Sequence, residues 1–465
     1  MFDKQIYIQR RNDLAKAMQH GLILLIGNQE VGINYKGNPY PFRQDSSVLY
    51  YSGIERQDIG LIVDIGNSKS FLIGNEATID DLVWTGPIPT LRELADRAGI
   101  DDVLDYSSAI RIIESNQNKG TPIHYLPIYR GDHAFEISKL TGTDIRRVKD
   151  EYSKELCLSV VHQREIKSKI EIEELEAAIN TSGLMHRTMM QIAKAGMKES
   201  TLMAAVRSIC LSKDVDIPYN IILSKDGQTL HNVTYKNILQ HGQLVLGDFG
   251  AESTRRYAGD ITRTIPVSKN FSPLQADIYS IVLNALNSSI AGLKNGVKYI
   301  DTHLAAARII TEGMKSLGFL KGDPEEIIAQ GAHAIFYPHG LGHPLGLDVH
   351  DCEGIGEEYT GYEGGMERSN QFGLKSLRLA KELKTGMTIT VEPGIYFVPE
   401  LISLWKSEKK FESFIDYSKI ETALPFGGIR IEDNVLILDH GAQILGKPIP
   451  KLIKEVEALR AEAYQ

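Results

Sequence analysis

Residues 245–264, VLGDFGAESTRRYAGDITRT, place two aspartates in an otherwise apolar stretch that has the composition of β-strands. Asp248 follows the run Leu244-Val245-Leu246-Gly247, and Asp260 is flanked by Ala258, Gly259 and Ile261. Two buried carboxylates repel each other, and each costs several kcal/mol to remove from water unless a positive charge compensates it. The rest of the chain must therefore supply a positive partner for both aspartates.

The segment STRR between the two aspartates suggests the turn of an antiparallel hairpin. If Thr254 is at the centre of the turn, Asp248 and Asp260 face each other on one side of the sheet. In the alternative interpretation one of the two carboxylates points to solvent, because a Gly-Asp pair often marks the end of a strand.

Three further stretches carry polar residues at apolar positions. The segment YPHGLGHPLGLDVHD (337–351) holds three histidines, TITVEPGIYF (388–397) contains Glu392, and FGGIRIEDNVLIL (426–438) contains Arg430 and Glu432. Local violations of this kind tend to mark functional sites. Two Asp, two Glu and one His form a donor set for two hard divalent cations, and this set favours Mn²⁺ over Zn²⁺. Two such ions would also cancel the charge of the four carboxylates.

The order Asp…Asp…HGLGH…VEPG…RIED resembles the metallopeptidases of the pita-bread fold, in the branch of aminopeptidase P and prolidase. The segment FRQDSSVLYYSG (42–53) is similar to the leading domain of that branch. The resemblance implies an α/β (α+β) fold, with a small mixed α/β domain over residues 1–158 and a pita-bread catalytic domain over residues 159–465.

The resemblance also implies a role for each residue of these motifs. Glu392 would accept a proton, His231 and His350 would bind the substrate and donate to the developing oxyanion, and Arg430 would brace the site. Two metal ions would lower the pKa of a shared water and make hydroxide available at neutral pH. The implied metal ligands are Asp248, Asp260, His343, Glu392 and Glu432, and the implied catalytic residues are His231, His339, His350, Glu392 and Arg430.

The activity implied by the resemblance is hydrolysis of the bond between an N-terminal residue and a following proline. The close alternative is a dipeptidase that acts on Xaa-Pro dipeptides. In prolidases an arginine in a similar run holds the free carboxylate of the dipeptide, and GLKSLR (373–378) places Arg378 in that position. The competing interpretation is an amphipathic helix whose arginine meets water.

One departure from the family concerns the spacing of the two aspartates, which is one residue longer here than usual. We expect the extra residue in the turn at Ser253–Arg256, where insertions are tolerated. A bulge inside a strand would instead change the direction in which the Asp248 side chain points.

Rival functions within the same fold are non-catalytic binding proteins and creatinase, which lack the five-ligand set. Methionine aminopeptidase is disfavoured by the N-terminal domain. A purely structural interpretation needs four chance carboxylates in apolar strands, which the cost of burial disfavours.

Composition restricts the partners and the compartment. A net charge of −9 gives no basic surface for nucleic acid. We find no apolar run of about 18 residues for a transmembrane helix and no signal peptide. Three scattered cysteines without metal-ligand spacing favour a reducing compartment, and hence the cytoplasm.

The expected substrates are proline-containing peptides. The resemblance implies a homodimer or homotetramer, and Co²⁺ or Zn²⁺ is an alternative to Mn²⁺.

The pattern of apolar residues predicts the secondary structure. In the first half it predicts helices over 5–20 and 90–99, and strands over 21–27, 46–54, 59–66 and 71–74. In the second half it predicts helices over 170–195, 199–212, 272–295 and 299–317, and strands near 218–224, 244–252, 257–267, 388–397 and 428–438. Residues 352–382 and 398–427 are expected to be long, weakly organised loops.

Overall fold

The computed structural model describes residues 1–464, which form two compact units. The N-terminal unit comprises Met1–Arg164 and Cys352–Tyr359, and the C-terminal unit comprises Glu165–Asp351 and the residues from Thr360 onward. The predicted boundary after residue 158 lies inside helix α8 (Lys154–Glu165) and stays a prediction.

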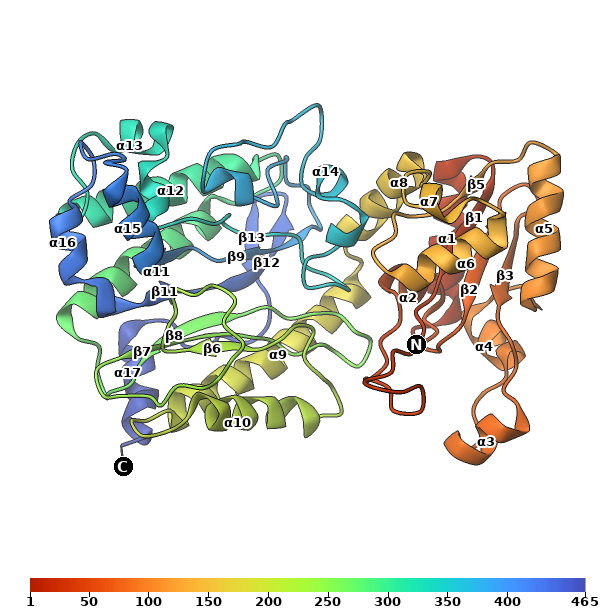
Figure 1. Ribbon diagram of the computed structural model, residues 1–465, viewed down its shortest axis with the longest axis horizontal. Coiled ribbons are helices and arrows are strands. Elements are labelled where there is room, and N and C mark those ends of the chain that lie inside the picture. The colour runs from red at the N-terminus through yellow and green to blue at the C-terminus, as the bar shows by residue number, and fades with distance from the viewer. Residues whose placement is uncertain (465) are drawn as a thin grey trace. The chain divides into compact units, whose positions relative to one another are not determined.

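The N-terminal unit is a five-stranded mixed sheet covered by helices (Figure 1). The strand order is β4-β3-β2-β1-β5, in which β5 pairs with β1 and β4 pairs with β3 in parallel, while β1–β2 and β2–β3 are antiparallel. The strands are β1 (Leu22–Ile26), β2 (Gly60–Asp64), β3 (Lys69–Ile73), β4 (Asp102–Leu104) and β5 (Ile123–His124). The helices are α1 (Lys4–Met18), α2 (Ser46–Ser52), α3 (Ile79–Thr85), α4 (Leu91–Ala98), α5 (Tyr106–Asn118), α6 (Gly131–Thr141), α7 (Ile145–Val148) and α8.

Helix α4 begins and ends where the sequence predicts. The side chain of Thr90 accepts a hydrogen bond from the backbone N–H of Glu93, and the Glu93 carboxylate accepts one from the backbone N–H of Thr90, which forms a capping box. Gly99 ends the helix in the left-handed conformation.

The prediction of a strand over 46–54 is wrong, because Ser46–Ser52 forms helix α2. The Asp45 carboxylate caps this helix by accepting hydrogen bonds from the backbone N–H groups of Ser47 and Val48. All seven residues of α2 are buried, so the apolar run reflects burial on every side of a short helix.

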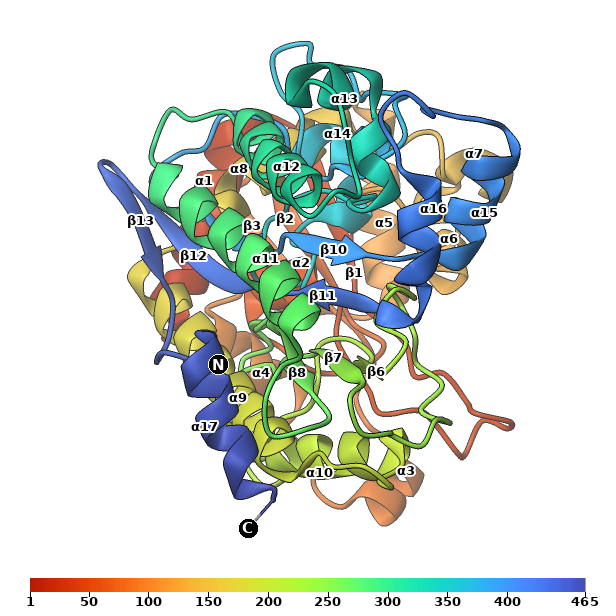
Figure 2. The same ribbon diagram turned by 90° about the vertical axis from the view of Figure 1, so that its left-hand side faces the viewer.

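The C-terminal unit surrounds three small antiparallel sheets with helices. The sheets are β6-β7-β8, β10-β11 and β13-β12-β9. Figure 2 shows α11 lying across β10 and β11, with α9 and α17 side by side below. The strands are β6 (Ile222–Ser224), β7 (Leu244–Asp248), β8 (Thr262–Pro266), β9 (Thr388–Val391), β10 (Gly394–Tyr396), β11 (Gly428–Arg430), β12 (Asp433–Leu438) and β13 (Gly441–Ile444).

The helices of this unit are α9 (Lys169–Ile192), α10 (Glu199–Leu211), α11 (Pro273–Gly292), α12 (Tyr299–Ser316), α13 (Pro324–Gln330), α15 (Pro399–Ser407), α16 (Tyr417–Thr422) and α17 (Ile453–Glu462). Helix α14 (Glu357–Thr360) begins in the segment Cys352–Tyr359 of the N-terminal unit. Short 3₁₀ turns lie at Ala332–Ile335, Glu353–Ile355, Leu374–Ser376 and Leu424–Phe426. The segment 398–427, predicted as a loop, contains α15 and α16. Trp405 of α15 packs against Phe372 and Phe411, and this apolar contact orders a segment whose overall polarity suggested a loop.

Arg263 on β8 joins the hairpin β7–β8 to the beginning of β12. Its fully buried guanidinium donates to the backbone carbonyls of Thr262, Glu432, Ile449 and Pro450 and to the Asp433 carboxylate at 2.8 Å. The position of the strand end that carries Glu432 therefore depends on this side chain.

We expect the substitution Arg263→Met to lower the free energy of unfolding by about 3–5 kcal/mol, because it leaves several buried carbonyls without this donor and leaves Lys451 as the remaining cation at the buried Asp433 carboxylate. Denaturant unfolding measures this loss. Arg187 is a matched control, since its guanidinium donates to the Pro448 carbonyl at the surface. Arg187→Met should cost about 1 kcal/mol or less. Equal losses for the two variants would contradict the role of Arg263.

Candidate metal centre and cleft

The strands β7 and β8 form a hairpin without a bulge. Asp248 pairs with Thr262 in the ladder, and the same register continues to a bridge between Glu252 and Ala258. A three-residue turn, 254–256, closes the hairpin, and Arg256 has the left-handed φ of 69° that such turns use. The hairpin therefore has no bulge that would redirect Asp248, and the place of the extra residue in the turn stays a prediction.

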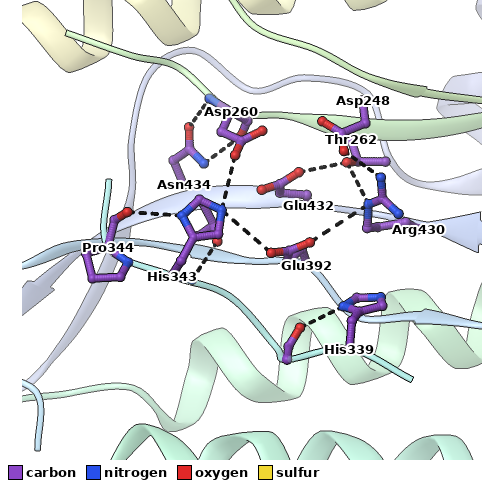
Figure 3. Close-up of polar contacts among 12 residues, drawn as sticks. Asp248, Asp260, Thr262, His339, His343, Pro344, Glu392, Arg430, Glu432 and Asn434 are labelled. Carbon is purple, nitrogen blue, oxygen red and sulfur yellow. Dashed lines mark hydrogen bonds and ion pairs between the residues drawn. The ribbon is translucent and has the colours of Figure 1, made fainter. Parts of the chain in front are cut away.

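The predicted pairing of Asp248 with Asp260 needs a correction. The turn is centred on Arg255 instead of Thr254, so Thr262 is the residue opposite Asp248. Asp260 lies two residues before Thr262 and is therefore a diagonal neighbour of Asp248 on the same face. The Asn434 side chain holds this part of the hairpin by hydrogen bonds to the backbone N–H and carbonyl of Asp260 (Figure 3).

Asp260, His343 and Glu432 form a buried cluster that can hold a metal ion, since one ligand atom from each lies within 4.8 Å of the others. His343 Nε2 is 3.3 Å from the Asp260 carboxylate and 3.7 Å from that of Glu392 (Figure 3). His343 Nδ1 lies 3.0 Å from the Pro344 carbonyl, which only accepts hydrogen bonds. Nδ1 therefore carries a proton, and in the neutral ring the lone pair of Nε2 faces the carboxylates, as a metal ligand requires.

Asp248 and Glu392 complete the group of carboxylates on the side of Arg430. Arg430 Nη2 donates to Asp248 at 2.5 Å, and Arg430 Nε lies 3.9 Å from Glu392 (Figure 3). The Tyr219 hydroxyl lies 2.9 Å from the Asp248 carboxylate and also donates to Asp260. The five residues predicted as metal ligands are thus brought together.

The electrostatics of the cluster show a deficit of positive charge. Burial, and then the neighbouring carboxylates, raise the pKa of Glu432 well above its ordinary value, and burial raises the pKa of Glu392 to about 8. Burial also raises the pKa of Asp248 and Asp260. Arg430 alone does not neutralise four carboxylates.

One carboxylate oxygen of Glu432 gives further support for divalent cations at this site. Glu432 Oε2 accepts a hydrogen bond from the Thr262 hydroxyl at 2.7 Å, whereas the buried Oε1 has no hydrogen-bond partner among residues 1–464. An orphaned carboxylate oxygen in a group of four carboxylates and one imidazole matches the donor set of hard divalent ions.

The cluster lies at a cleft of about 390 Å³. The other predicted site residues, His231, His339, His350 and Arg378, line the same cleft. The His350 ring packs against the His343 ring with centroids 4.2 Å apart. The predicted helix around Arg378 is absent from the described residues, which have only the 3₁₀ turn Leu374–Ser376 there. The interpretation of Arg378 as part of a solvated helix face is therefore wrong.

His339 is held in one tautomer. Its Nδ1 donates to the Gly340 carbonyl at 2.7 Å, so Nε2 accepts from the Tyr396 hydroxyl at 2.8 Å. Burial, with a contribution from Arg430, lowers the pKa of His339 to about 3. A neutral ring with both nitrogens engaged is suited to form a wall of the cleft and to orient Tyr396, which in turn accepts a hydrogen bond from Arg430.

Four residues that hold the site in place were not predicted from the sequence, namely Tyr219, Thr262, Tyr396 and Asn434. Thr262 and Asn434 each lie two positions from a predicted ligand, Asp260 and Glu432. Residues two apart on a strand share a face, so this spacing was the signal available for both.

Comparison with known proteins identifies the family. The model for metallopeptidase family M24 matches residues 173–439, and the model for the aminopeptidase P N-terminal domain matches residues 7–124. The chain belongs to metallopeptidase family M24. The predicted resemblance and the predicted fold class are confirmed. The family implies that the M24 unit binds divalent metal ions.

Relatives match this M24 chain over nearly its whole length. A probable Xaa-Pro aminopeptidase of Fusarium vanettenii is 32% identical over 95% of this chain and 92% of its own length. The Xaa-Pro dipeptidase of Homo sapiens is 30% identical over 96% and 90%. Aminopeptidase P of E. coli, solved with the inhibitor Pro-Leu, is 27% identical with a TM-score of 0.82 over 100% of this chain and 99% of the E. coli chain.

Among residues 1–464, none of the helices combines the length and the apolar character needed to cross a membrane.

We expect Glu432→Ala to fold but to retain less than half of the metal bound by the parent chain, because it removes the carboxylate oxygen that lacks a protein partner. Metal analysis after dialysis, together with the rise in thermal midpoint on adding Mn²⁺, measures this loss. Glu382→Ala, at an exposed carboxylate of the same unit, is the control. Full metal content in Glu432→Ala would exclude Glu432 as a ligand.

Proposed function

We propose that this chain is a Xaa-Pro aminopeptidase, which hydrolyses the bond between an N-terminal residue and a following proline. The single observation that carries the proposal is the buried cluster of Asp260, His343 and Glu432 at the cleft, with the partly buried carboxylates of Asp248 and Glu392 beside it. Relatives named Xaa-Pro aminopeptidase and Xaa-Pro dipeptidase support the substrate class.

In this proposal two divalent ions occupy the cluster. Asp248, Asp260, His343, Glu392 and Glu432 would hold them, and the excess of carboxylate oxygen over nitrogen favours Mn²⁺, with Co²⁺ or Zn²⁺ as alternatives. When bound, the ions supply Lewis acidity toward the scissile carbonyl and the attacking water.

The proton transfers are assigned to Glu392. Its side chain is 18% exposed, against 7% for Asp260 and 13% for Asp248, so it is more accessible from the cleft than either aspartate. Glu392 would take a proton from the attacking water and deliver it to the proline nitrogen as the peptide bond breaks. Arg430, paired with Asp248 and close to Glu392, would keep both carboxylates in place.

The oxyanion and the proline are assigned to the histidines. His231 and His350, which both line the cleft, would donate hydrogen bonds to the oxygen of the scissile carbonyl as its charge develops. His339, fixed by Gly340 and Tyr396, would present its ring as one wall for the proline.

A second candidate function is a dipeptidase that acts on Xaa-Pro dipeptides. The observation that favours it is the position of Arg378, which lines the same cleft as Glu392 and His231. A cation at that position can hold the free carboxylate of a dipeptide.

The assembly and the compartment complete the proposal. We propose a homodimer or homotetramer, which light scattering after size exclusion tests. We propose a reducing compartment, the cytoplasm, because Cys157, Cys210 and Cys352 form no disulfide in the structure.

The substrate length is tested by Arg378→Ala. If Arg378 holds a substrate carboxylate, the loss of a charged hydrogen bond of about 1.5–3 kcal/mol lowers kcat/KM for Xaa-Pro dipeptides roughly 10–150-fold. A Xaa-Pro-Xaa tripeptide should be little affected. Steady-state kinetics on matched peptides gives both values, with exposed Lys375→Ala as the control in the same segment. Equal losses on both substrates, or none on either, would refute the role of Arg378 in holding a substrate carboxylate. The aminopeptidase would then remain as the single proposed function.

A further inference from the structure

The loop that carries His231 has no regular secondary structure to hold it. This segment, residues 225–237, follows β6 and is called the His231 loop below. It brings Leu230, His231 and Val233 to the wall of the cleft. The His231 ring makes no hydrogen bond within the part of the chain that the structure describes, so its position depends on what anchors the loop.

The anchor is a buried carboxylate on a neighbouring helix. Glu199, the first residue of α10, is fully buried, and no cationic side chain among residues 1–464 lies within 4 Å of it. A buried carboxylate without a cation is tolerated only where hydrogen-bond donors satisfy it. Nothing in the chemistry described above uses Glu199.

All the donors to Glu199 come from the two ends of the His231 loop and the residue before it. Oε1 accepts from the Ser224 hydroxyl at 2.9 Å, the Lys225 backbone N–H at 2.8 Å and the Asn237 side-chain amide at 3.1 Å. Oε2 accepts from the Asn237 backbone N–H at 3.1 Å. One carboxylate therefore fixes the start and the end of the loop to the same point.

A second link extends from this point to His231. The Ser224 hydroxyl, which donates to Glu199, accepts a hydrogen bond from the Asn232 side-chain amide at 3.0 Å. Asn232 follows His231 directly in the chain, and its side-chain oxygen accepts from the Thr234 backbone and hydroxyl. The contacts Glu199–Ser224–Asn232 thus fix the backbone next to a ring that has no hydrogen bond of its own.

We infer that Glu199 is a positioning residue, which acts through Ser224 and Asn232 to hold His231 against the substrate. This inference rests on the proposed function for the role of His231. The clamp itself, in which Glu199 orders residues 225–237, is a property of the protein without metal or substrate.

The first test is a double-mutant comparison with Glu199→Gln. Glutamine has the same shape but offers one acceptor oxygen, and its amide N–H groups would meet the donors of Asn237. We expect kcat/KM for a Xaa-Pro peptide to fall about 10–100-fold in the parent chain, the range that a displaced active-site group causes. In the His231→Ala background the same substitution should cost less than about threefold, because the group that it positions is gone.

The second test measures the order of the loop without any activity. Lys225 and Lys236 are trypsin sites within the His231 loop. In the metal-free protein we expect Glu199→Gln to accelerate cleavage at these two sites, as identified by mass spectrometry. Glu171→Gln is the matched control, because Glu171 is also a buried first-turn glutamate, on α9, and accepts hydrogen bonds from Ser168 and Tyr257. It should lower stability without accelerating cleavage within 225–237.

The outcomes separate the inference from the proposed function. An equal loss of kcat/KM in both backgrounds, or unchanged cleavage of the loop, would overturn the positioning role of Glu199. If the parent chain does not hydrolyse Xaa-Pro peptides, the proposed function fails, while the cleavage comparison still decides the clamp. If Glu199→Gln does not fold, Asn232→Ala replaces it in both tests, since it keeps the Glu199 carboxylate and removes the link beside His231.

Discussion

The burial of four carboxylates around one imidazole is the constraint on which the catalytic unit depends. Glu432 has an oxygen without a hydrogen-bond partner, and burial raises the pKa of both Glu432 and Glu392, so that added positive charge is needed to favour their ionised forms. Arg430 supplies one cationic group. Divalent cations, which the family implies, would supply the missing charge, while the surrounding strands bring the ligands together at the cost of their mutual repulsion.

The residues that hold the metal site come from different strands and loops of the three small sheets. The β7–β8 hairpin supplies Asp248 and Asp260, the residues after β9 and β11 supply Glu392 and Glu432, and the loop before β9 supplies His343. Neutral and cationic side chains then hold the carboxylates in place, with Tyr219 and Arg430 on their oxygens and Asn434 on the backbone. At the wall of the cleft, hydrogen bonds play the same positioning role, since Glu199 holds the loop that carries His231.

Much of this was predictable from residues that break local propensity. Aspartates and glutamates within apolar strands indicated the centre, and the motif order indicated the family and fold. Helix α2 was not predictable from its pattern, because a short helix buried on all sides has no polar face. The predicted centre of the hairpin turn, Thr254, was one residue too early. The turn spans residues 254–256 and is centred on Arg255, and it uses the left-handed conformation of Arg256. Residues such as Tyr219 and Glu199 act through contacts made only in three dimensions.

The stoichiometry of bound metal tests the central claim most directly. Metal-free protein can be titrated with Mn²⁺ by calorimetry while hydrolysis of a Xaa-Pro peptide is followed in parallel. We predict two ions per chain, with hydrolysis appearing as the sites fill, because two divalent charges balance four carboxylates. Hydrolysis at full rate without bound divalent ions, or no binding of such ions by the folded chain, would contradict the account.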